Sequence, residues 1–318
     1  MCGVETVAVL GGGTMGGGIA GHFARAGLTV RLGDASAEQT EQALERLRQR
    51  IAGHVEAGLL PEEALHATVE ASELEAAVDG ADLVIEAVPE DPELKAEILA
   101  RASKGTDGVI ATNTSSLPIA ELAESVERPE RFLGVHWFNP PEWTPGIEVI
   151  AGTATDRAVV ERVLEFLRDV GKQPAEVADR AGFVSNRLQM ALLREALAIV
   201  AEGQTTREDL DTIVRSTFGF RLPFFGPFQI ADMAGLDTYV GVYKTLERDV
   251  GPEFAPPQEL VELVEAGRVG AKAGAGFEEY SDEESDRLLL ERDGRYAALA
   301  RLLGAKPGTS VPSGGLAE

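Results

Sequence analysis

The feature that most constrains the fold of this chain is a glycine-rich turn, Gly11-Gly12-Gly13-Thr14-Met15-Gly16. The turn follows the apolar run Val7-Ala8-Val9-Leu10, which is typical of a buried strand, and it opens an amphipathic segment that ends near Gly27. In such a G-x-G-x-x-G turn the first glycine permits the tight bend, the second lets the backbone approach a pyrophosphate, and the third lets helix and strand pack closely. The sequence therefore predicts the dinucleotide-binding unit of a Rossmann fold, with amide groups of the helix N-terminus facing the anion.

An aspartate stands where this unit requires a ribose contact. Asp34 follows the next apolar run, Leu28–Leu32, at close to the roughly 20 residues that separate turn and acid in dinucleotide-binding proteins. Its carboxylate would accept hydrogen bonds from the adenosine ribose and would repel a 2′-phosphate, so NAD is favoured over NADP. A glycine-rich turn in another kind of α/β protein is the alternative, but strand, helix and acid together argue against it. We expect NAD as the cofactor, bound by Gly11, Gly13, Thr14, Met15, Gly16 and Asp34.

Short apolar runs alternate with helical patterns along the first half of the chain. The runs predicted to be strands are Val4–Leu10, Leu28–Leu32, Ala81–Val88, Gly108–Thr112 and Arg131–Phe138. Helical segments separate most of them, which predicts a parallel sheet with helices on both faces. Between residues 37 and 71, a strongly charged segment predicts an inserted pair of helices.

The second part of the chain has a different pattern. From Val184 onward the apolar spacing is helical, and Thr206, followed by acidic residues, is a helix N-cap candidate. The fold class is therefore α/β, an N-terminal Rossmann domain with a helical insertion followed by an all-helical C-terminal domain. We expect an NAD-binding domain over residues 1–182, a helical domain over 183–303, and a flexible tail rich in Gly, Pro and Ser over 304–318.

Charge and cysteine content exclude several classes of partner. The formal net charge of -24 at pH 7 would repel nucleic acid and anionic membrane surfaces. No apolar stretch approaches the ~20 residues that span a bilayer, and we expect no export signal, because the residues before the first strand lack its pattern. The single cysteine, Cys2, can form no internal disulfide, which fits a reducing compartment. We expect a cytoplasmic protein with no nucleic-acid partner, no membrane partner and no metal site.

The same charge raises a question about the cofactor, which is itself an anion. Because the Debye length at physiological ionic strength is about 8 Å, donors close to the phosphates can outweigh a distant repulsive field. Binding of NAD to this chain therefore requires hydrogen-bond donors at the glycine-rich turn.

Polar residues follow two of the predicted strands. Asn113-Thr114-Ser115-Ser116 comes after one strand, and His136 lies at the end of another, so both should reach the carboxyl edge of the sheet, where open α/β folds bind ligands. Oxidation of an alcohol requires a base of near-neutral pKa, which histidine supplies, and a carboxylate to orient it. Glu148 lies on a following strand and is the candidate carboxylate. The other histidines, His22, His54 and His66, fall on helical or charged segments and are expected to be packing or surface residues.

Along nearly its whole length the sequence resembles the 3-hydroxyacyl-CoA dehydrogenase family. The segments that carry the resemblance occur in the family's order and are Val9–Gly16, Glu86–Glu90, Thr112–Leu117, His136–Pro140, Gly182–Leu188, Gly226–Phe228 and Gly270–Phe277. The resemblance implies NAD-dependent, reversible oxidation of a 3-hydroxyacyl thioester in fatty acid metabolism. It also implies that the C-terminal helical domain closes over the substrate and forms a homodimer.

The resemblance assigns roles to individual residues. His136 corresponds to the family's general base and Glu148 to its partner carboxylate. Ser115 and Asn186 correspond to residues that bind the substrate oxygen, and Asn139 to an asparagine of the same active-site strand. Glu90 and Lys95 correspond to residues near the nicotinamide ribose, and Asn113 is expected to contact the cofactor.

Two departures from the family pattern concern the substrate. The family's inserted helix carries a serine and a lysine that contact coenzyme A, and the corresponding residues here are Arg50 and Ala57, the latter beside Glu56. After Asn139-Pro140 the chain continues Pro141-Glu142-Trp143-Thr144-Pro145, and we expect this acid and tryptophan to reshape the substrate pocket.

Other functions therefore stay open. One is the same chemistry on a free or carrier-protein-bound hydroxy acid, which the altered insertion favours. Another is a non-enzymatic NAD-binding structural or sensor protein, as in the lambda-crystallin relatives. Against the second, the base, its carboxylate, Ser115 and Asn186 are all present, and a protein that only binds NAD does not need them.

Overall fold

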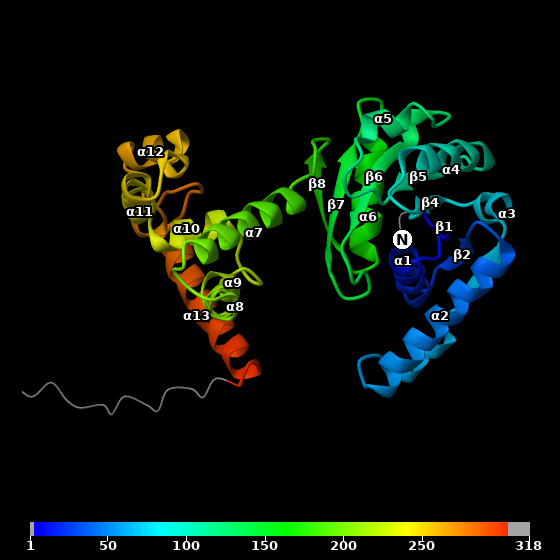
Figure 1. The fold of residues 1–318 in the computed structure, drawn as a ribbon, viewed down its shortest axis with the longest axis horizontal. Coiled ribbons are helices and arrows are strands. Elements are labelled where there is room, and N and C mark those ends of the chain that lie inside the picture. Colours follow the sequence, from blue (N-terminus) through cyan, green and yellow to red (C-terminus); the bar gives the residue numbers. More distant parts are fainter. Residues whose placement is uncertain (1–2, 305–318) are drawn as a thin grey trace, which may run out of the picture. The chain divides into compact units, whose positions relative to one another are not determined.

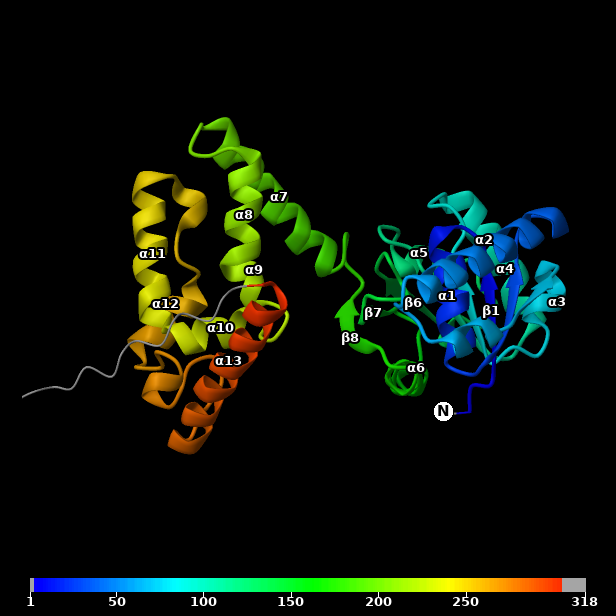
Figure 2. The ribbon, with the colours of Figure 1, turned by 90° about the horizontal axis from the view of Figure 1, so that it is seen from below.

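A computed structural model describes residues 3–304 of the chain, drawn in Figures 1 and 2. The chain divides into two compact units, with the boundary between Leu193 and Arg194. The expectations about Cys2 and about residues 305–318 lie outside the described residues. The proposed domain boundary between residues 182 and 183 stays a proposal, because helix α7 (Ser185–Ala201) begins close to it and runs through the border of the two units.

The first unit is built on one eight-stranded sheet with the order β3-β2-β1-β4-β5-β6-β7-β8. All neighbouring strands are parallel except β6 and β7, which are antiparallel. The strands are β1 (Thr6–Leu10), β2 (Thr29–Gly33), β3 (Val69–Ser72), β4 (Leu83–Glu86), β5 (Val109–Thr112), β6 (Phe132–Trp137), β7 (Gly146–Ala151) and β8 (Gln173–Ala178). The predicted α/β architecture is confirmed.

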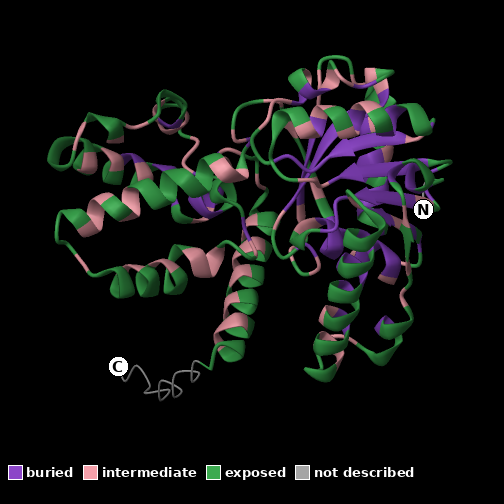
Figure 3. Ribbon diagram, turned by 45° about the vertical axis from the view of Figure 1, so that its right-hand side comes forward, coloured by how far each residue is buried: buried purple, intermediate pink, exposed green. Residues whose placement is uncertain are grey.

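Helices cover both faces of this sheet, and Figure 3 shows its central strands as the buried layer. The helices α1 (Thr14–Arg25), α2 (Ala37–Glu56) and α6 (Arg157–Asp169) contribute to one core, and α3 (Leu74–Val78), α4 (Pro92–Gly105) and α5 (Ile119–Ala123) to the other. Alternate side chains of β1 enter opposite cores, since Val7 and Val9 face the first and Ala8 and Leu10 the second. Burial on both faces explains why this strand is apolar at every one of these positions.

The five predicted strands are present, as is the strand expected to carry Glu148 (β7), but two further strands, β3 and β8, were not predicted. Both lie at the edges of the sheet, and most of their residues are exposed or half-buried. β8 also contains Pro174, which is tolerated at a sheet edge. A strand that buries few side chains lacks the apolar pattern on which strand prediction depends.

The expectation of two inserted helices is wrong in its second half. α2 spans 20 residues, but only a short 3-10 helix, Glu62–His66, follows it, and the chain then enters β3. Gly58, with a φ of 68°, ends the helical path after α2, and Pro61 precedes the 3-10 helix. Leu47 and Ile51 pack with Ala64 and so hold the short helix against α2.

The second unit is helical, as expected. After α7 it contains α8 (Arg207–Ser216), α9 (Phe218–Arg221), α10 (Pro227–Ala234), α11 (Leu236–Asp249), α12 (Gln258–Glu265) and α13 (Asp282–Leu302), with short 3-10 turns at Pro252–Phe254 and Ala271–Ala273. Thr206 caps α8 by accepting a hydrogen bond from the Asp209 amide. The buried Asp232 accepts hydrogen bonds from the Phe277 and Glu278 amides and from the Tyr280 hydroxyl, which ties the segment before α13 to α10.

None of the helices in residues 3–304 combines the length and the apolar character that a bilayer-spanning helix requires.

His22 makes the stability of the first unit dependent on pH. Its Nε2 contacts the Val170 carbonyl oxygen at 3.0 Å, and burial, together with the positive charge of Lys172, lowers its pKa to about 4 from an ordinary 6.5. The unfolded chain therefore binds this proton first as the pH falls, so the stabilisation is complete above pH 6.5 and is lost towards pH 4. We predict that this residue accounts for about 2 kcal/mol of the stability lost between pH 7.5 and pH 5.

Urea unfolding of the protein and of His22→Phe at the two pH values measures this contribution. The variant should lose about 2 kcal/mol less than the wild type on acidification. Equal losses in the two proteins would show that His22 takes up its proton as readily in the folded state as in the unfolded one.

Candidate functional site

Four neighbouring parallel strands end at one edge of the sheet, and a hollow of about 590 Å³ lies there. It is lined by residues that follow β1, β2, β4 and β5, together with side chains of α2. Of the predicted cofactor residues the lining includes Gly11, Gly13, Thr14, Met15, Asp34, Glu90 and Asn113, and it also includes Ser115. A second hollow of about 460 Å³ shares Gly11 and Asp34 and extends to the apolar side chains of Leu94 and Ile98.

The glycine-rich turn is shaped as a dinucleotide requires. Gly11 has a φ of 101°, and a Cβ there would lie 2.7 Å from the Ala87 carbonyl oxygen. A Cβ on Gly16 would overlap the Gly11 carbonyl oxygen, so α1 packs against the turn only because that position is glycine. Gly13, the N-cap of α1, offers no side chain to the first amides, which stay available to an anion.

Asp34 lies at the end of β2 and faces the turn. One carboxylate oxygen accepts a hydrogen bond from the Gly12 amide at 2.8 Å, and the other accepts one from the Ala35 amide at 2.7 Å. These contacts fix the carboxylate beside both hollows, where it would meet a ribose.

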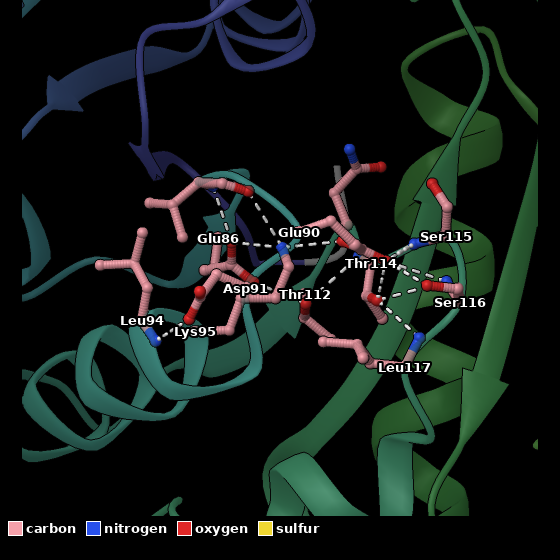
Figure 4. A network of polar contacts seen from close by, with 12 residues as sticks. Glu86, Glu90, Asp91, Leu94, Lys95, Thr112, Thr114, Ser115, Ser116 and Leu117 are labelled. Carbon is pink, nitrogen blue, oxygen red and sulfur yellow. Dashed lines mark hydrogen bonds and ion pairs between the residues drawn. The ribbon is translucent and has the colours of Figure 1, made fainter.

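A buried ion pair supports the edge of the sheet, as Figure 4 shows. The Lys95 ammonium lies 2.8 Å from one Glu86 carboxylate oxygen and donates to the Val88 carbonyl oxygen at 3.1 Å. Both side chains are at most 1% exposed. The second Glu86 oxygen accepts a hydrogen bond from the Thr112 hydroxyl at 2.6 Å, so that β4, β5 and α4 are joined through one carboxylate.

Glu90 is the second centre of this network (Figure 4). One of its oxygens accepts hydrogen bonds from the Thr114 hydroxyl and from the amides of Ser115 and Ser116, at 2.6 to 3.0 Å. The other oxygen lies 3.4 Å from the Lys95 ammonium. Burial opposes ionisation of Glu90, but these hydrogen bonds and the positive charge of Lys95 outweigh it and lower the pKa of the carboxyl.

His136 and Glu148 stand directly opposite each other on β6 and β7. The His136 Nδ1 and a Glu148 carboxylate oxygen are 2.8 Å apart, and both residues are buried. The imidazole ring lies against Phe138 at 4.6 Å and against Phe183 at 5.6 Å between ring centroids. Within residues 3–304 no hydrogen bond engages the second ring nitrogen, Nε2, which is therefore free for a ligand.

The other oxygen of Glu148 holds the start of α7. It accepts hydrogen bonds from the amides of Val184 and Ser185 at 3.0 and 2.8 Å. These amides are presented by a turn in which Gly182 and the buried Phe183 both have a positive φ. One carboxylate thus fixes the imidazole and the first turn of a helix together, and it stands at the positive end of the helix dipole.

The structure brings together most of the predicted substrate residues. The Asn186 amide, in the first turn of α7, donates to the Ser115 carbonyl oxygen at 3.1 Å. Asn113 is buried and accepts a hydrogen bond from the Trp137 amide at 2.8 Å, which joins the end of β5 to β6. Asn139 is exposed in the loop after β6 and makes no side-chain hydrogen bond to any residue in the described part of the chain.

Sequence reasoning did not assign Glu86, Thr112 or Thr114 to the site. Their hydrogen bonds to Lys95 and Glu90 depend on how neighbouring strands meet. A usable signal was present in Glu86, which is an acid at the end of an otherwise apolar strand. An acid buried at such a position requires a cation, and Lys95 is the first one that follows in the chain.

The loop between β6 and β7, whose sequence differs from the family pattern, contacts α2. The Arg50 Nε lies 2.9 Å from a Glu142 carboxylate oxygen, an ion pair by distance although its atoms are not aligned for a hydrogen bond. Trp143 packs edge-on against His54, with 5.3 Å between centroids. Lys172 fixes this loop by donating hydrogen bonds to the Pro141 and Thr144 carbonyl oxygens. Burial, together with the positive charge of Arg25, lowers the pKa of this lysine to about 8.

Comparisons with known proteins agree with this geometry. The chain matches the model of the 3-hydroxyacyl-CoA dehydrogenase NAD-binding domain over residues 6–180 and that of the C-terminal domain over residues 182–280. It is 37% identical to 3-hydroxybutyryl-CoA dehydrogenase of Mycobacterium tuberculosis, covering 87% of this chain and 99% of that protein.

Two further relatives match over most of their length. Identity is 36% with 5-formyl-3-hydroxy-2-methylpyridine 4-carboxylate 5-dehydrogenase of Mesorhizobium japonicum, covering 94% of this chain and 98% of the relative. The crystal structure of a 3-hydroxyacyl-CoA dehydrogenase from Archaeoglobus fulgidus has a TM-score of 0.80 at 35% identity, covering 95% of this chain and all of that one.

The buried Glu86–Lys95 pair should dominate the stability of this edge. Lys95→Met leaves an uncompensated carboxylate in a position with no solvent access, and we predict a loss of about 3–5 kcal/mol in the free energy of unfolding. Lys104→Met, at an exposed position of the same helix, is the matched control and should cost at most about 0.5 kcal/mol. Denaturant unfolding measures both, and equal costs would contradict the central place of this pair.

Proposed function

Because the chain belongs to the 3-hydroxyacyl-CoA dehydrogenase family, we propose that it reversibly oxidises the hydroxyl group at carbon 3 of an acyl compound, with His136 as the general base. Family membership makes the chain an NAD-dependent oxidoreductase. The observation that carries the proposal is the buried His136, whose Nδ1 is held by Glu148 while Nε2 stays free.

The contacts of His136 account for its proposed role. With Nδ1–H donated to the Glu148 carboxylate, the lone pair lies on Nε2, which takes the proton of the substrate hydroxyl. When bound, NAD would supply the acceptor for the hydride on the carbon that carries this hydroxyl. The negative charge of Glu148 then stabilises the imidazolium that forms.

The remaining site residues position the substrate and the cofactor. We assign Ser115, Asn186 and Asn139 to binding of the substrate oxygen, since Ser115 and Asn186 already meet beside the cofactor hollow. The glycine-rich turn and Asp34 would bind the adenosine and pyrophosphate portion. Glu90 and Asn113 would face the nicotinamide end, and the buried Lys95 would act near it through Glu90.

Two forms of the substrate are supported by different observations. A 3-hydroxyacyl-CoA thioester is the first candidate, since the family model and the relative from M. tuberculosis carry that name.

A free or carrier-bound hydroxy acid is the second. Arg50 is paired with Glu142, and residues 51–66 contain three glutamates but neither lysine nor arginine. This charge pattern disfavours a polyanionic nucleotide tail along the end of α2 and the 3-10 helix that follows it. The relative from M. japonicum is named for a pyridine carboxylate, which is a small acid.

The assembly and the location of the protein are further parts of the proposal. α7 has no buried residue, and its Leu188, Met190, Leu193 and Leu197 are at least half exposed, which supports a homodimer that covers this helix. We also propose a cytoplasmic enzyme of fatty acid metabolism. The non-enzymatic alternative is less favoured, because a buried His–Glu pair with a free nitrogen serves proton transfer and contributes nothing to NAD binding.

The test of the base is His136→Ala. Loss of general base catalysis should lower kcat/KM for alcohol oxidation at least ~100-fold, while the Kd for NADH stays within about twofold because His136 lies outside the cofactor hollow. His66→Ala, at an exposed position, is the control and should leave both values unchanged. Undiminished turnover in His136→Ala would refute the proposed mechanism.

The substrate form can be tested with two thioesters that share their reacting atoms. NADH oxidation is followed with acetoacetyl-CoA and with the N-acetylcysteamine thioester of acetoacetate, which lacks the nucleotide. Free acetoacetate is measured in parallel. If residues 51–66 repel the nucleotide, kcat/KM for the small thioester should equal or exceed that for the CoA thioester. A CoA thioester preferred at least about tenfold would instead support the first candidate.

Asp34 should set cofactor preference. Asp34→Ala removes the acceptor for the ribose hydroxyls and the charge that repels a 2′-phosphate, so NADH binding should weaken about tenfold and the preference for NADH over NADPH should shrink. Fluorescence titration with both cofactors measures this. An unchanged ratio of the two Kd values would remove Asp34 from this role.

A further inference from the structure

α2 presents two arginines to the glycine-rich turn. Arg46 and Arg50 lie one helical turn apart, on the same face of α2. An Arg46 guanidinium nitrogen lies 3.4 Å from the Gly12 carbonyl oxygen, and an Arg50 nitrogen lies 3.4 Å from the Thr14 carbonyl oxygen. Both side chains line a small hollow of about 140 Å³ whose opposite wall is the turn itself.

The two arginines differ in their charge balance. Arg50 is paired with Glu142, whose side chain is only 3% exposed, so its charge is compensated within the fold. Arg46 makes no ion pair with any residue of the described range, and its one hydrogen bond is the long contact with Gly12. Arg46 also lines the larger cofactor hollow, which Arg50 does not. The positive charge of Arg46 is therefore not compensated by a neighbouring acid, and it lies beside the turn where the phosphates of a dinucleotide would bind.

We propose that Arg46 binds the pyrophosphate of NAD from the α2 side, opposite the amides of the α1 N-terminus. A guanidinium donates several hydrogen bonds in one plane, which suits phosphate oxygens. The chain has a net charge of -24, and the amides at the N-terminus of α1 offer only a partial positive charge. Arg46 adds a full positive charge beside them. The proposal rests on the NAD cofactor and not on the identity of the substrate.

The experiment compares Arg46→Gln with Arg48→Gln. Arg48 lies two positions further on the same helix and is exposed, and within residues 3–304 its one ion pair is with Glu45, at 3.9 Å. Its replacement therefore makes the same charge change away from the turn. Binding of NADH, NADPH, ADP-ribose and adenosine is measured by titration or competition at 10 mM and 150 mM salt, without any substrate.

Arg46→Gln should weaken NADH and ADP-ribose about tenfold at low salt, and should weaken adenosine, which has no phosphate, less than twofold. The loss should shrink at 150 mM salt, because screening reduces the contribution of an exposed charge. Arg48→Gln should bind all ligands like the wild type. Arg46→Lys keeps the charge but not the planar set of donors, so it should lose less affinity than Arg46→Gln.

Three results would overturn the proposal. The first is equal behaviour of Arg46→Gln and Arg48→Gln, which would reduce the effect to the net charge of the helix. The second is an equal loss for adenosine and ADP-ribose, which would place Arg46 on the adenine ring. The third is a loss confined to NADPH, which would make Arg46 a contact of the 2′-phosphate.

Discussion

The Glu148 carboxylate makes two sets of contacts on which the rest of the candidate site depends. One oxygen holds Nδ1 of His136, and the other accepts the first amides of α7. Because α7 also carries Asn186, which donates to the Ser115 carbonyl oxygen, one buried group places the proposed base and the helix of one proposed substrate ligand. A buried carboxylate requires hydrogen-bond donors, and the imidazole and the amides at the start of α7 supply them here.

Carboxylates that bind several donors are also found along the sheet edge, beside the cofactor hollow. Glu86 is buried with Lys95, and Glu90 collects the donors of the segment after β5, so that the strand ends are joined by carboxylates with full sets of partners. The strongly negative chain thus places its functional acids against local donors, and it leaves at least one cation, Arg46, beside the turn that must bind an anion.

The sequence was sufficient where burial or a rigid motif leaves a pattern. Strands buried on both faces, such as β1 and β6, are largely apolar, and the glycine-rich turn with Asp34 has few structural alternatives. It was insufficient at the edge strands β3 and β8, which bury too little to be recognised. It also gave no sign that Glu142 and Trp143 contact α2, or that Glu148 reaches the start of α7, because these contacts join residues that come together only in the folded chain.

The most direct test of the account is kcat/KM of Glu148→Gln. The glutamine carbonyl can still accept the α7 amides, but its NH₂ group would meet Nδ1 and favour the tautomer in which Nε2 carries a proton and cannot act as a base. kcat/KM should fall at least ~100-fold, with an unchanged Kd for NADH. A variant within threefold of the wild type would contradict it and would leave Glu148 as a helix cap alone.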